Sequence, residues 1–432
     1  MPHPGTSRGD YMTKHVIIGN GPAGVIAAET IRQNAPDDTI LLVGREPEPP
    51  YSRMAIPYLL LGTADEAGTY LRKDPQHFSR LRIEQTCGSV DSIDTSASAL
   101  RMQGGDSIAF DRLLIATGSR PVLPNIPGID TPGVHTCWTL DDARQIMRLA
   151  KPGARVVLIG AGYIGCIVME ALAARRVRLA VIEQRDRVMP NLLGAGAGNM
   201  LKHWCERKGI KVHTSTRVDA IEAGAPLTVT LSNQQLLEAD LVICTTGVQP
   251  NVDFLRDSGI KIRQGVVVNA WMQTNVAGIY AAGDCAEAFD AESGNATIAG
   301  VQSNAADQAL CAGLNMAGKH AFQRGVRQVN VLDTMGLISG SFGQWRGVSG
   351  GQWVEFNDER NFRYLRLEFS NDVLVGSNSI GLSEHSTVLQ ELIQRHVALG
   401  EWKDKLLQDP TCLKEAYRAC VQLRYTQQAP SN

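Results

Sequence analysis

Two glycine-rich stretches hold the residues with the clearest chemistry: I-G-N-G-P-A-G at 18–24 and L-I-G-A-G-Y-I-G at 158–165. In such a turn the first glycine permits the tight bend, the second lets the backbone approach a pyrophosphate, and the third lets helix and strand pack closely. The helix N-terminus then faces the anion. Two such turns, each between a strand-like and a helix-like segment, predict two dinucleotide sites rather than two purely structural turns. The candidate residues are Gly19, Gly21, Pro22, Ala23 and Gly24 in the first site and Gly160, Gly162, Tyr163, Ile164 and Gly165 in the second.

An acidic residue at the end of the next strand usually accepts hydrogen bonds from the adenosine ribose. In the second unit Glu183 follows the apolar run L-A-V-I and lies 18 residues beyond Gly165. A carboxylate there would repel a 2′-phosphate, so the sequence favours NADH over NADPH. Arg185 and Arg187 follow closely and could soften that preference, although a solvent-facing role suits them equally well.

The first unit lacks an acid at the corresponding position. Its strand T-I-L-L-V-G ends in Gly44, where the acid is expected, and Glu46 comes two residues later. Glu46 is therefore the candidate that binds the ribose of the first nucleotide.

Each glycine turn needs a strand before it and a helix after it. The first unit runs from a strand at 15–18 through a helix at 25–35 to a strand at 39–44, and the second repeats the scheme over 154–183. Their first glycines are 141 positions apart. The pattern predicts an α/β protein with two Rossmann-like domains.

The remaining segments indicate how the chain is divided. A stretch rich in proline and glycine at 120–133 has the composition of a linker. Residues 330–380 change to strand-like runs, such as Y-L-R-L-E-F at 364–369, where apolar and polar side chains alternate. Residues 386–425 have apolar residues at helical spacing, expected to pack on their own domain.

Composition excludes several classes of function. Charged residues make up 20% of the 432 residues, the formal net charge is −2, and no long block of one charge occurs. Nucleic acid is therefore not an expected partner. The polar residues 1–13 are expected to be a flexible tail without a secretory signal, and glycines break the apolar run at 156–174. We therefore expect that the chain does not span a membrane and that it is located in the cytoplasm.

The nine cysteines are widely scattered and include no C-x-x-C pair. This spacing argues against a zinc site or an iron–sulfur cluster, so no metal is expected. Most of the thiols lie in apolar runs and are expected to be small buried side chains in a reducing compartment.

Five motifs in a fixed order carry a resemblance to a known family. They are G-N-G-P-A-G at 19–24, A-T-G at 116–118, G-A-G-Y-I-G at 160–165, T-G-V-Q-P-N at 246–251 and Y-A-A-G-D at 280–284. From residue 14 to about 320 the chain resembles the pyridine nucleotide–disulfide oxidoreductase superfamily. Within it, E-P-E-P-P-Y-S-R-M-A-I-P-Y-L-L-L-G at 46–62 is similar to the ferredoxin and rubredoxin reductases and to the flavin part of NADH-dependent nitrite reductases.

The resemblance implies a glutathione reductase-type fold with FAD on the first unit, NAD(H) on the second and a C-terminal α+β interface domain. It carries over Asp284 as the residue that binds the ribityl–phosphate part of the flavin, and Thr117 with Gly118 as residues that line the crossing between domains. A helix matching 301–318 would begin at the flavin. Further candidates are Arg53, Ala116, Gly283 and Val301 for FAD, the weaker Lys73 at the flavin edge, and Thr246 and Gly247 for NAD.

Two departures from the family pattern bear on the chemistry. Met54 occupies the position of the single redox cysteine of the coenzyme A disulfide reductases, and the first helix has no C-x-x-x-x-C pair. A thioether cannot form a mixed disulfide or a sulfenic acid, so thiol and peroxide chemistry of that type is not expected. Ile167 stands where many relatives carry a glutamate near the nicotinamide. No catalytic side chain beyond the flavin is assigned.

The expected enzyme is an FAD-dependent NADH oxidoreductase that exchanges electrons with a separate small iron–sulfur or rubredoxin-type carrier. Two alternatives stay open: an NADH oxidase or a reductase of quinones or small molecules, and a nucleotide-binding subunit of a larger redox complex. A homodimer is also left open. The expected domains are a tail at 1–13, a discontinuous FAD-binding domain at 14–125 and 250–325, an NAD-binding domain at 126–249 and a C-terminal domain with a helical tail at 326–432.

Overall fold

The first parallel β-sheet is built from strands that are apolar along most of their length, as is typical of strands covered by helices on both faces. In the computed structural model, which describes residues 12–290, 294–326 and 329–422, its strand order is β19-β7-β1-β2-β3. The strands are β1 (Lys14–Ile18), β2 (Thr39–Gly44), β3 (Ile83–Cys87), β7 (Arg112–Ile115) and β19 (Ile279–Ala281).

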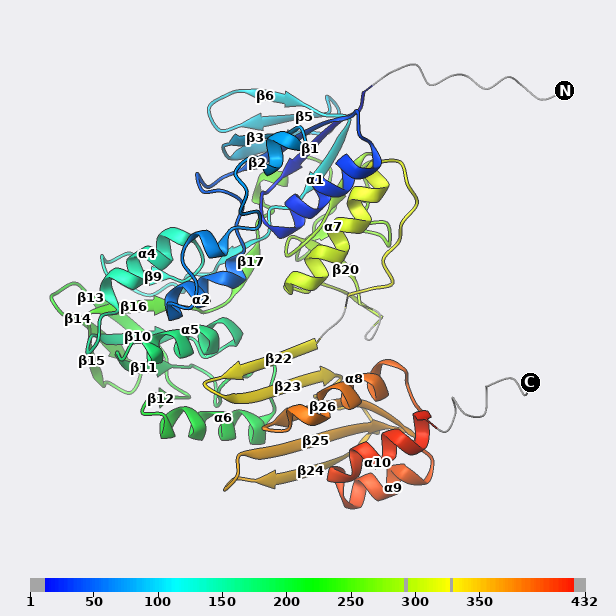
Figure 1. The fold of residues 1–432 in the computed structure, drawn as a ribbon. Helices are drawn as coiled ribbons and strands as arrows, with labels where there is room; N and C mark the ends of the chain where they lie inside the picture. The colour runs from blue at the N-terminus through cyan, green and yellow to red at the C-terminus, as the bar shows by residue number, and fades with distance from the viewer. Residues whose placement is uncertain (1–11, 291–293, 327–328, 423–432) are drawn as a thin grey trace, which may run out of the picture. The chain divides into compact units, whose positions relative to one another are not determined.

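Two helices, α1 (Pro22–Asn34) and α7 (Gln302–Met316), pack against each other beside this sheet (Figure 1). Helix α1 begins at Pro22, where the missing backbone N–H leaves no intrahelical bond unmade. One hydrophobic core joins the buried residues of both helices to the strands. These elements belong to unit 1 of the two compact units of the chain, which comprises residues 1–56, 64–120 and 248–327.

Unit 1 also contains short strands and single turns of helix. Their bounds are β4 (Val90–Asp94), β5 (Ala99–Met102), β6 (Ser107–Ala109), β8 (Ser119–Pro121) paired with β17 (Val248–Pro250), β18 (Val266–Val267), β20 (Ala286–Phe289), β21 (Ala296–Thr297), α3 (His77–Arg80), and the 3₁₀ turns Arg53–Ala55, Ala67–Thr69 and Asp253–Leu255.

A second parallel sheet repeats the plan in unit 2, which comprises residues 57–63, 121–247 and 328–432. Its strand order is β12-β11-β10-β16-β9. A capping box between Thr139 and Asp142 starts its helix α4. The elements are β9 (Val134–Thr136), β10 (Arg155–Ile159), β11 (Arg178–Ile182), β12 (Lys211–His213), β16 (Leu241–Cys244), the antiparallel β13 (Val218–Glu222), β14 (Leu227–Leu231) and β15 (Leu236–Ala239), and the helices α2 (Ile56–Leu61), α4 (Leu140–Leu149), α5 (Tyr163–Ala174) and α6 (Ala195–Arg207).

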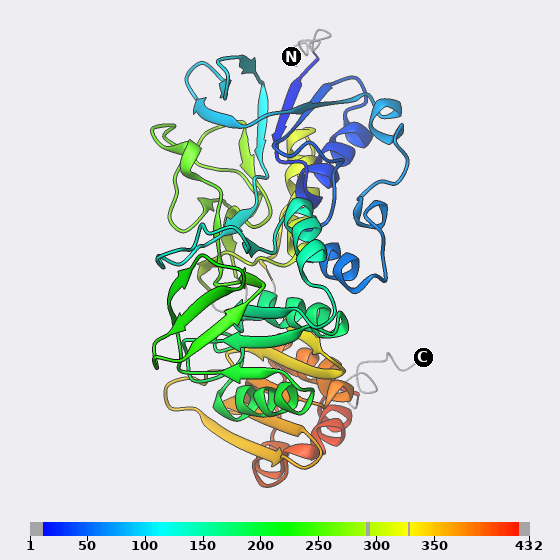
Figure 2. The same cartoon turned by 90° about the vertical axis from the view of Figure 1, so that its left-hand side faces the viewer.

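An antiparallel sheet of order β22-β23-β26-β25-β24 follows in the same unit, with helices α8, α9 and α10 along it (Figures 1 and 2). Leu365, Leu367 and Phe369 alternate along β25 and join the core beneath these helices. The strands are β22 (Val329–Thr334), β23 (Leu337–Gly343), β24 (Gln352–Asp358), β25 (Arg363–Ser370) and β26 (Val373–Ile380), and the helices are α8 (Ser386–Gln394), α9 (Glu401–Gln408) and α10 (Leu413–Tyr417), with single turns at Ser383–His385, Pro410–Cys412 and Arg418–Gln422.

The predicted fold class is confirmed: two Rossmann-like parallel sheets and a C-terminal α+β part. The helical C-terminal segment is interrupted, because Gly400 adopts a φ of +56° and Pro410 starts a new turn. No helix in the described ranges is both long and apolar enough to cross a membrane. Most of the predicted tail (1–11) and the last residues of the chain (423–432) lie outside the described residues.

Candidate functional site

The carboxyl ends of the strands of the first parallel sheet bring the predicted flavin residues to one edge. Gly19 follows β1, Ala116 follows β7, and Gly283 comes two residues after the end of β19. Parallel strands end at the same edge of a sheet, and ligands of open α/β sheets bind there. All residues predicted for FAD fall in unit 1, and all residues predicted for NAD fall in unit 2.

The first glycine turn has the shape that a pyrophosphate requires. A Cβ atom on Gly19 would lie 2.1 Å from the carbonyl oxygen of Ala116, and one on Gly24 would lie 1.8 Å from that of Gly19. A Cβ on Gly21 would meet no atom within 4 Å, and no side chain caps α1. The outer glycines are thus fixed by packing, whereas the middle one leaves open space beside uncapped N–H groups.

The second glycine turn shows the same division. A Cβ on Gly160 would lie 2.6 Å from the Thr245 carbonyl oxygen, and one on Gly165 would lie 2.2 Å from that of Gly160. A Cβ on Gly162 would meet nothing within 4 Å, and α5 also begins without a side-chain cap. Both turns therefore fit the phosphates of a dinucleotide.

A Cβ placed on Gly300, two residues before α7, would lie 3.6 Å from Asp284 Oδ2, so this carboxyl group lies near the N-terminus of α7. Burial raises the pKa of the Asp284 carboxyl group, against the lowering effects of a Ser119 hydrogen bond and the charge of Arg53. The Ser119 hydroxyl donates to Asp284 Oδ2 at 3.0 Å. The buried Gln308 side chain accepts a hydrogen bond of 2.7 Å from the Gly283 amide. These two contacts fix the turn that presents the carboxylate.

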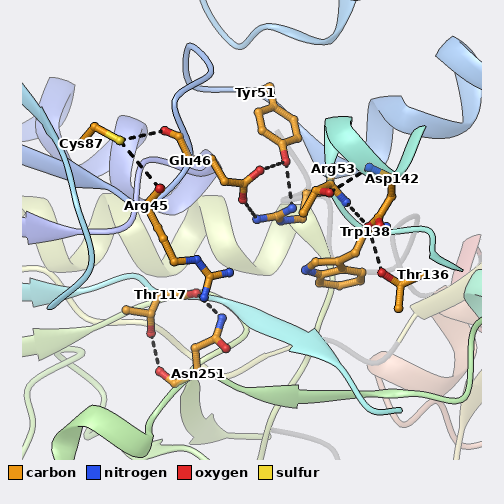
Figure 3. A network of polar contacts seen from close by, with 11 residues as sticks. Arg45, Glu46, Tyr51, Arg53, Cys87, Thr117, Thr136, Trp138, Asp142 and Asn251 are labelled. Atoms are coloured by element: carbon orange, nitrogen blue, oxygen red, sulfur yellow. Dashed lines mark hydrogen bonds and ion pairs between the residues drawn. The ribbon is translucent and has the colours of Figure 1, made fainter. Parts of the chain in front are cut away.

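Glu46 is engaged with two neighbours from the loop that follows it. Its carboxylate accepts hydrogen bonds of 2.5 Å from the Tyr51 hydroxyl and from Arg53 Nη2 (Figure 3). Arg53 Nη1 in turn donates to the Tyr51 oxygen at 2.9 Å. The structure therefore brings the predicted residues Glu46 and Arg53 together as an ion pair.

Strand register identifies the counterpart of Glu183 in the first unit. Ile18 pairs with Val43 and Ile159 pairs with Ile182, so Gly44 takes the place that Glu183 has in the second unit. The space beside Gly44 is filled by the side chain of Asn20, whose Nδ2 would lie 2.4 Å from a Cβ placed there. Asn20 was not identified from the sequence.

The segment after β7 is tied to the one after β17. The Thr117 hydroxyl donates to the Asn251 carbonyl at 2.8 Å, and Asn251 Nδ2 donates to the Thr117 carbonyl at 2.9 Å (Figure 3). The Asn251 backbone amide also donates to the Gly118 carbonyl at 2.9 Å, and Gly118 adopts a φ of +63°. Val301 is the residue immediately before α7.

Glu183 is 6% exposed and binds the second glycine turn directly. Its Oε2 accepts from the Ala161 amide at 2.9 Å and its Oε1 accepts from the Arg185 amide at 2.9 Å. Each carboxylate oxygen has a further acceptor position. Of the two nearby cations, Arg187 donates to the Leu193 carbonyl, whereas the Arg185 side chain is exposed.

The other residues predicted for the second site lie around the same edge. Tyr163 is the first residue of α5, and burial, with a smaller effect from Tyr58, raises the pKa of its phenol. The Thr246 hydroxyl donates to the Val122 carbonyl at 2.6 Å. Thr245, which sequence reasoning missed, donates to the Gly160 carbonyl at 2.9 Å and so holds the glycine turn to β16.

Among the described residues, few cysteine thiols are accessible to solvent. Met54 is 47% exposed, and Cys285 is buried, with its pKa raised by burial. Cys87 is the exposed thiol, while Cys412 is half-buried and the other seven are buried. Lys73 is exposed on the surface of unit 1.

A family model described as pyridine nucleotide-disulphide oxidoreductase matches residues 13–309, more than half of the chain. The chain belongs to this family. Its members bind FAD and NAD(P)H, so the chain is an NAD(P)H-dependent flavin oxidoreductase. The resemblance seen in the five sequence motifs is confirmed.

The names of the relatives in this family describe different roles. The NADH-dependent phenylglyoxylate dehydrogenase subunit epsilon of Aromatoleum evansii is 30% identical over 405 residues, which cover 92% of this chain and 95% of that one. Rhodocoxin reductase of Rhodococcus erythropolis is 32% identical over 315 residues, covering 72% and 74%. Putidaredoxin reductase, solved in a covalent complex with putidaredoxin, has a TM-score of 0.85 at 23% identity over 94% and 99% of the two chains, which shows a shared fold.

Proposed function

We propose that this flavin oxidoreductase takes hydride from NADH onto FAD and passes electrons to a separate small redox protein of iron–sulfur or rubredoxin type. The observation that carries the proposal is the pair of glycine turns, one in each unit, each with open space over its middle glycine. Bound FAD would accept hydride from the reduced nicotinamide and release the two electrons one at a time.

For FAD, we assign the pyrophosphate to the turn at Gly19, Gly21 and Gly24, with Pro22 and Ala23 starting the helix behind it. The uncapped N–H groups of α1 would bind the phosphate oxygens. Asp284, fixed by Ser119, would accept hydrogen bonds from the hydroxyl groups of the flavin side chain. Glu46 would bind the adenosine ribose after exchanging one of its present partners, Tyr51 or Arg53.

For the nicotinamide nucleotide, we assign the pyrophosphate to the turn at Gly160, Gly162 and Gly165 and the adenosine ribose to Glu183. The remaining acceptor positions of this carboxylate suit the 2′- and 3′-hydroxyls. A buried carboxylate beside the ribose opposes a 2′-phosphate, which supports NADH as the preferred donor.

A protein carrier is supported by the lack of a reactive thiolate at Met54 and at Cys285. Met54 offers no thiol, and Cys285 is buried with a raised pKa, so neither residue supplies a thiolate that could pass electrons onward. Rhodocoxin reductase, 32% identical, is by its name a reductase of rhodocoxin.

A second candidate is an electron-transferring subunit of a larger complex. It is favoured by the relative from Aromatoleum evansii, whose likeness extends over nearly the full length of both chains, including the C-terminal part. In that case the carrier would be another subunit rather than a diffusing protein.

The acceptor can be tested by reducing the FAD-loaded protein with NADH in the absence of air and then mixing it with one acceptor at a time. The panel would contain a ferredoxin, a rubredoxin, a quinone and dissolved oxygen. We expect the ferredoxin or the rubredoxin to reoxidise the reduced flavin faster than oxygen does. Fastest reoxidation by oxygen or the quinone would overturn it in favour of an oxidase or a small-molecule reductase, and slow reoxidation by the whole panel would favour the complex subunit.

A further inference from the structure

The loop of residues 184–194 links β11 to α6 and borders the end of β11 that carries Glu183. The Met189 amide donates to the Ala161 carbonyl at 2.8 Å, so the loop contacts the second glycine turn. The Arg185 amide donates to Glu183, and Arg185 Nη1 donates to the Asn191 side-chain oxygen at 3.0 Å. The loop thus sets where Arg185 lies relative to the acid.

The far end of this loop is held by side chains of the C-terminal sheet. Asn378, on β26, accepts from the Gly194 amide at 2.7 Å and donates to the Leu192 carbonyl at 3.1 Å. Arg346, which follows β23, donates to the Asn191 carbonyl at 3.1 Å. All of these residues belong to unit 2.

The Asn378 side chain is buried in the sheet and forms its hydrogen bonds with a segment that is distant in the sequence. It is 1% exposed and lies 184 positions from Gly194 in the sequence. A buried carboxamide that pairs both its donor and its acceptor with backbone groups fixes those groups in one geometry, since any shift would leave a buried polar atom unpaired.

We propose that Asn378 and Arg346 are positioning residues for the adenosine end of the nicotinamide nucleotide. They hold residues 191–194 in place, and Asn191 in turn accepts a hydrogen bond from the guanidinium of Arg185, the residue whose backbone amide donates to Glu183. This inference rests on the proposed assignment of the second glycine turn to NAD(H). It gives the C-terminal sheet a part in nucleotide recognition in addition to its packing.

The physical reason is preorganisation. A loop that is already ordered loses less conformational freedom when the nucleotide binds, and this difference appears as affinity. Without Asn378, the nucleotide itself would have to order the loop, including the Met189 amide that donates to the Ala161 carbonyl and the Arg185 side chain.

The test measures ADP-ribose, which contains the adenosine end and lacks the nicotinamide, by calorimetry on the FAD-loaded protein. Asn378→Leu keeps a similar volume and removes both hydrogen bonds, and Arg346→Ala removes an exposed side chain that should not affect folding. Asn361→Ala, at the β24–β25 hairpin, is the matched control, because its amide bonds only within the hairpin, to Asp358. KM and kcat for NADH are measured alongside.

For Asn378→Leu we expect ADP-ribose binding about fivefold weaker, the scale of one net hydrogen bond. The effect of Arg346→Ala should be smaller and in the same direction, with a raised KM for NADH and an unchanged kcat in both. Should Asn378→Leu fail to fold, Arg346→Ala decides. Native affinity in the folded variants would overturn the inference and leave the proposed function intact, whereas a native protein that does not bind ADP-ribose would overturn both.

Discussion

The Oε2 atom of Glu183 lies 2.9 Å from the backbone nitrogen of Ala161, so the acid at the end of β11 accepts a hydrogen bond from the glycine turn at the end of β10. One side chain therefore fixes the turn that would bind the pyrophosphate and keeps further acceptor positions that would suit the ribose. The first unit has no such bond, because Gly44 replaces the acid and Asn20 fills the space.

Glu183→Ala should raise KM for NADH by about tenfold or more, which corresponds to the loss of a hydrogen bond to a charged group. FAD content should not change, because the flavin is assigned to unit 1. Glu183→Gln, which keeps one acceptor oxygen for the Ala161 amide, should have a smaller effect. Steady-state kinetics measure KM for NADH, and the flavin-to-protein absorbance ratio measures FAD content. If Glu183→Ala had the same KM for NADH as the native protein, Glu183 would not belong to the site.

Gly21→Ala and Gly24→Ala should fail in different ways. A Cβ on Gly21 meets no protein atom, so this variant should fold with a stability within about 1 kcal/mol of the native apoprotein but lose FAD, because the methyl group occupies the space of the pyrophosphate. A Cβ on Gly24 would lie 1.8 Å from the Gly19 carbonyl oxygen, so the second variant should be destabilised by several kcal/mol. Thermal unfolding of the apoproteins and FAD titration separate the two, and normal FAD affinity in Gly21→Ala would contradict the assignment.

The two glycine units and their strands could be predicted because their signals are local. Each depends on residues within about thirty positions of one another, and the apolar strands are bounded by the glycines themselves. The contacts that complete the sites are not local: Ser119 meets Asp284 across 165 positions, and Gln308 meets Gly283 through the packing of α7. No spacing in the sequence indicates such pairs, because they arise only when helices and strands pack.

The counterpart of Glu183 shows a second limit of sequence reasoning. The sequence indicates that Gly44 replaces an acid, but only strand pairing shows that the two positions correspond and that the Asn20 amide lies against Gly44. In the C-terminal segment the apolar spacing at 386–425 predicted a helical run. The structure has three helices there, α8, α9 and α10, with breaks near Gly400 and Pro410.

Protein stability should fall as the pH decreases below about 6.5, the ordinary pKa of histidine. Burial lowers the pKa of His15, and also that of His213 and His385, so the folded state binds fewer protons than the unfolded chain. Their full contribution is present above the unfolded value and is lost as the pH falls toward the lowered folded values. Urea unfolding at pH 7.5 and 5.5 measures this. His15→Gln should reduce the difference.

Thiol modification should leave electron transfer intact. Iodoacetamide under native conditions should label the exposed Cys87 first and spare buried thiols such as Cys285, whose pKa is raised by burial. NADH-driven reduction of the carrier should keep about its full rate. Mass spectrometry identifies the labelled cysteines, and Cys87→Ser is the control. A loss of activity that persists in the Cys87→Ser variant would reveal a thiol on the electron path.

Hydride transfer from NADH to the flavin can be measured through the absorbance of the FAD-loaded protein during stepwise addition of NADH in the absence of air. We predict that the oxidised flavin band disappears with about one NADH per FAD, because a hydride carries two electrons. A protein that takes up no FAD, or whose flavin stays oxidised with excess NADH, would contradict the proposed function.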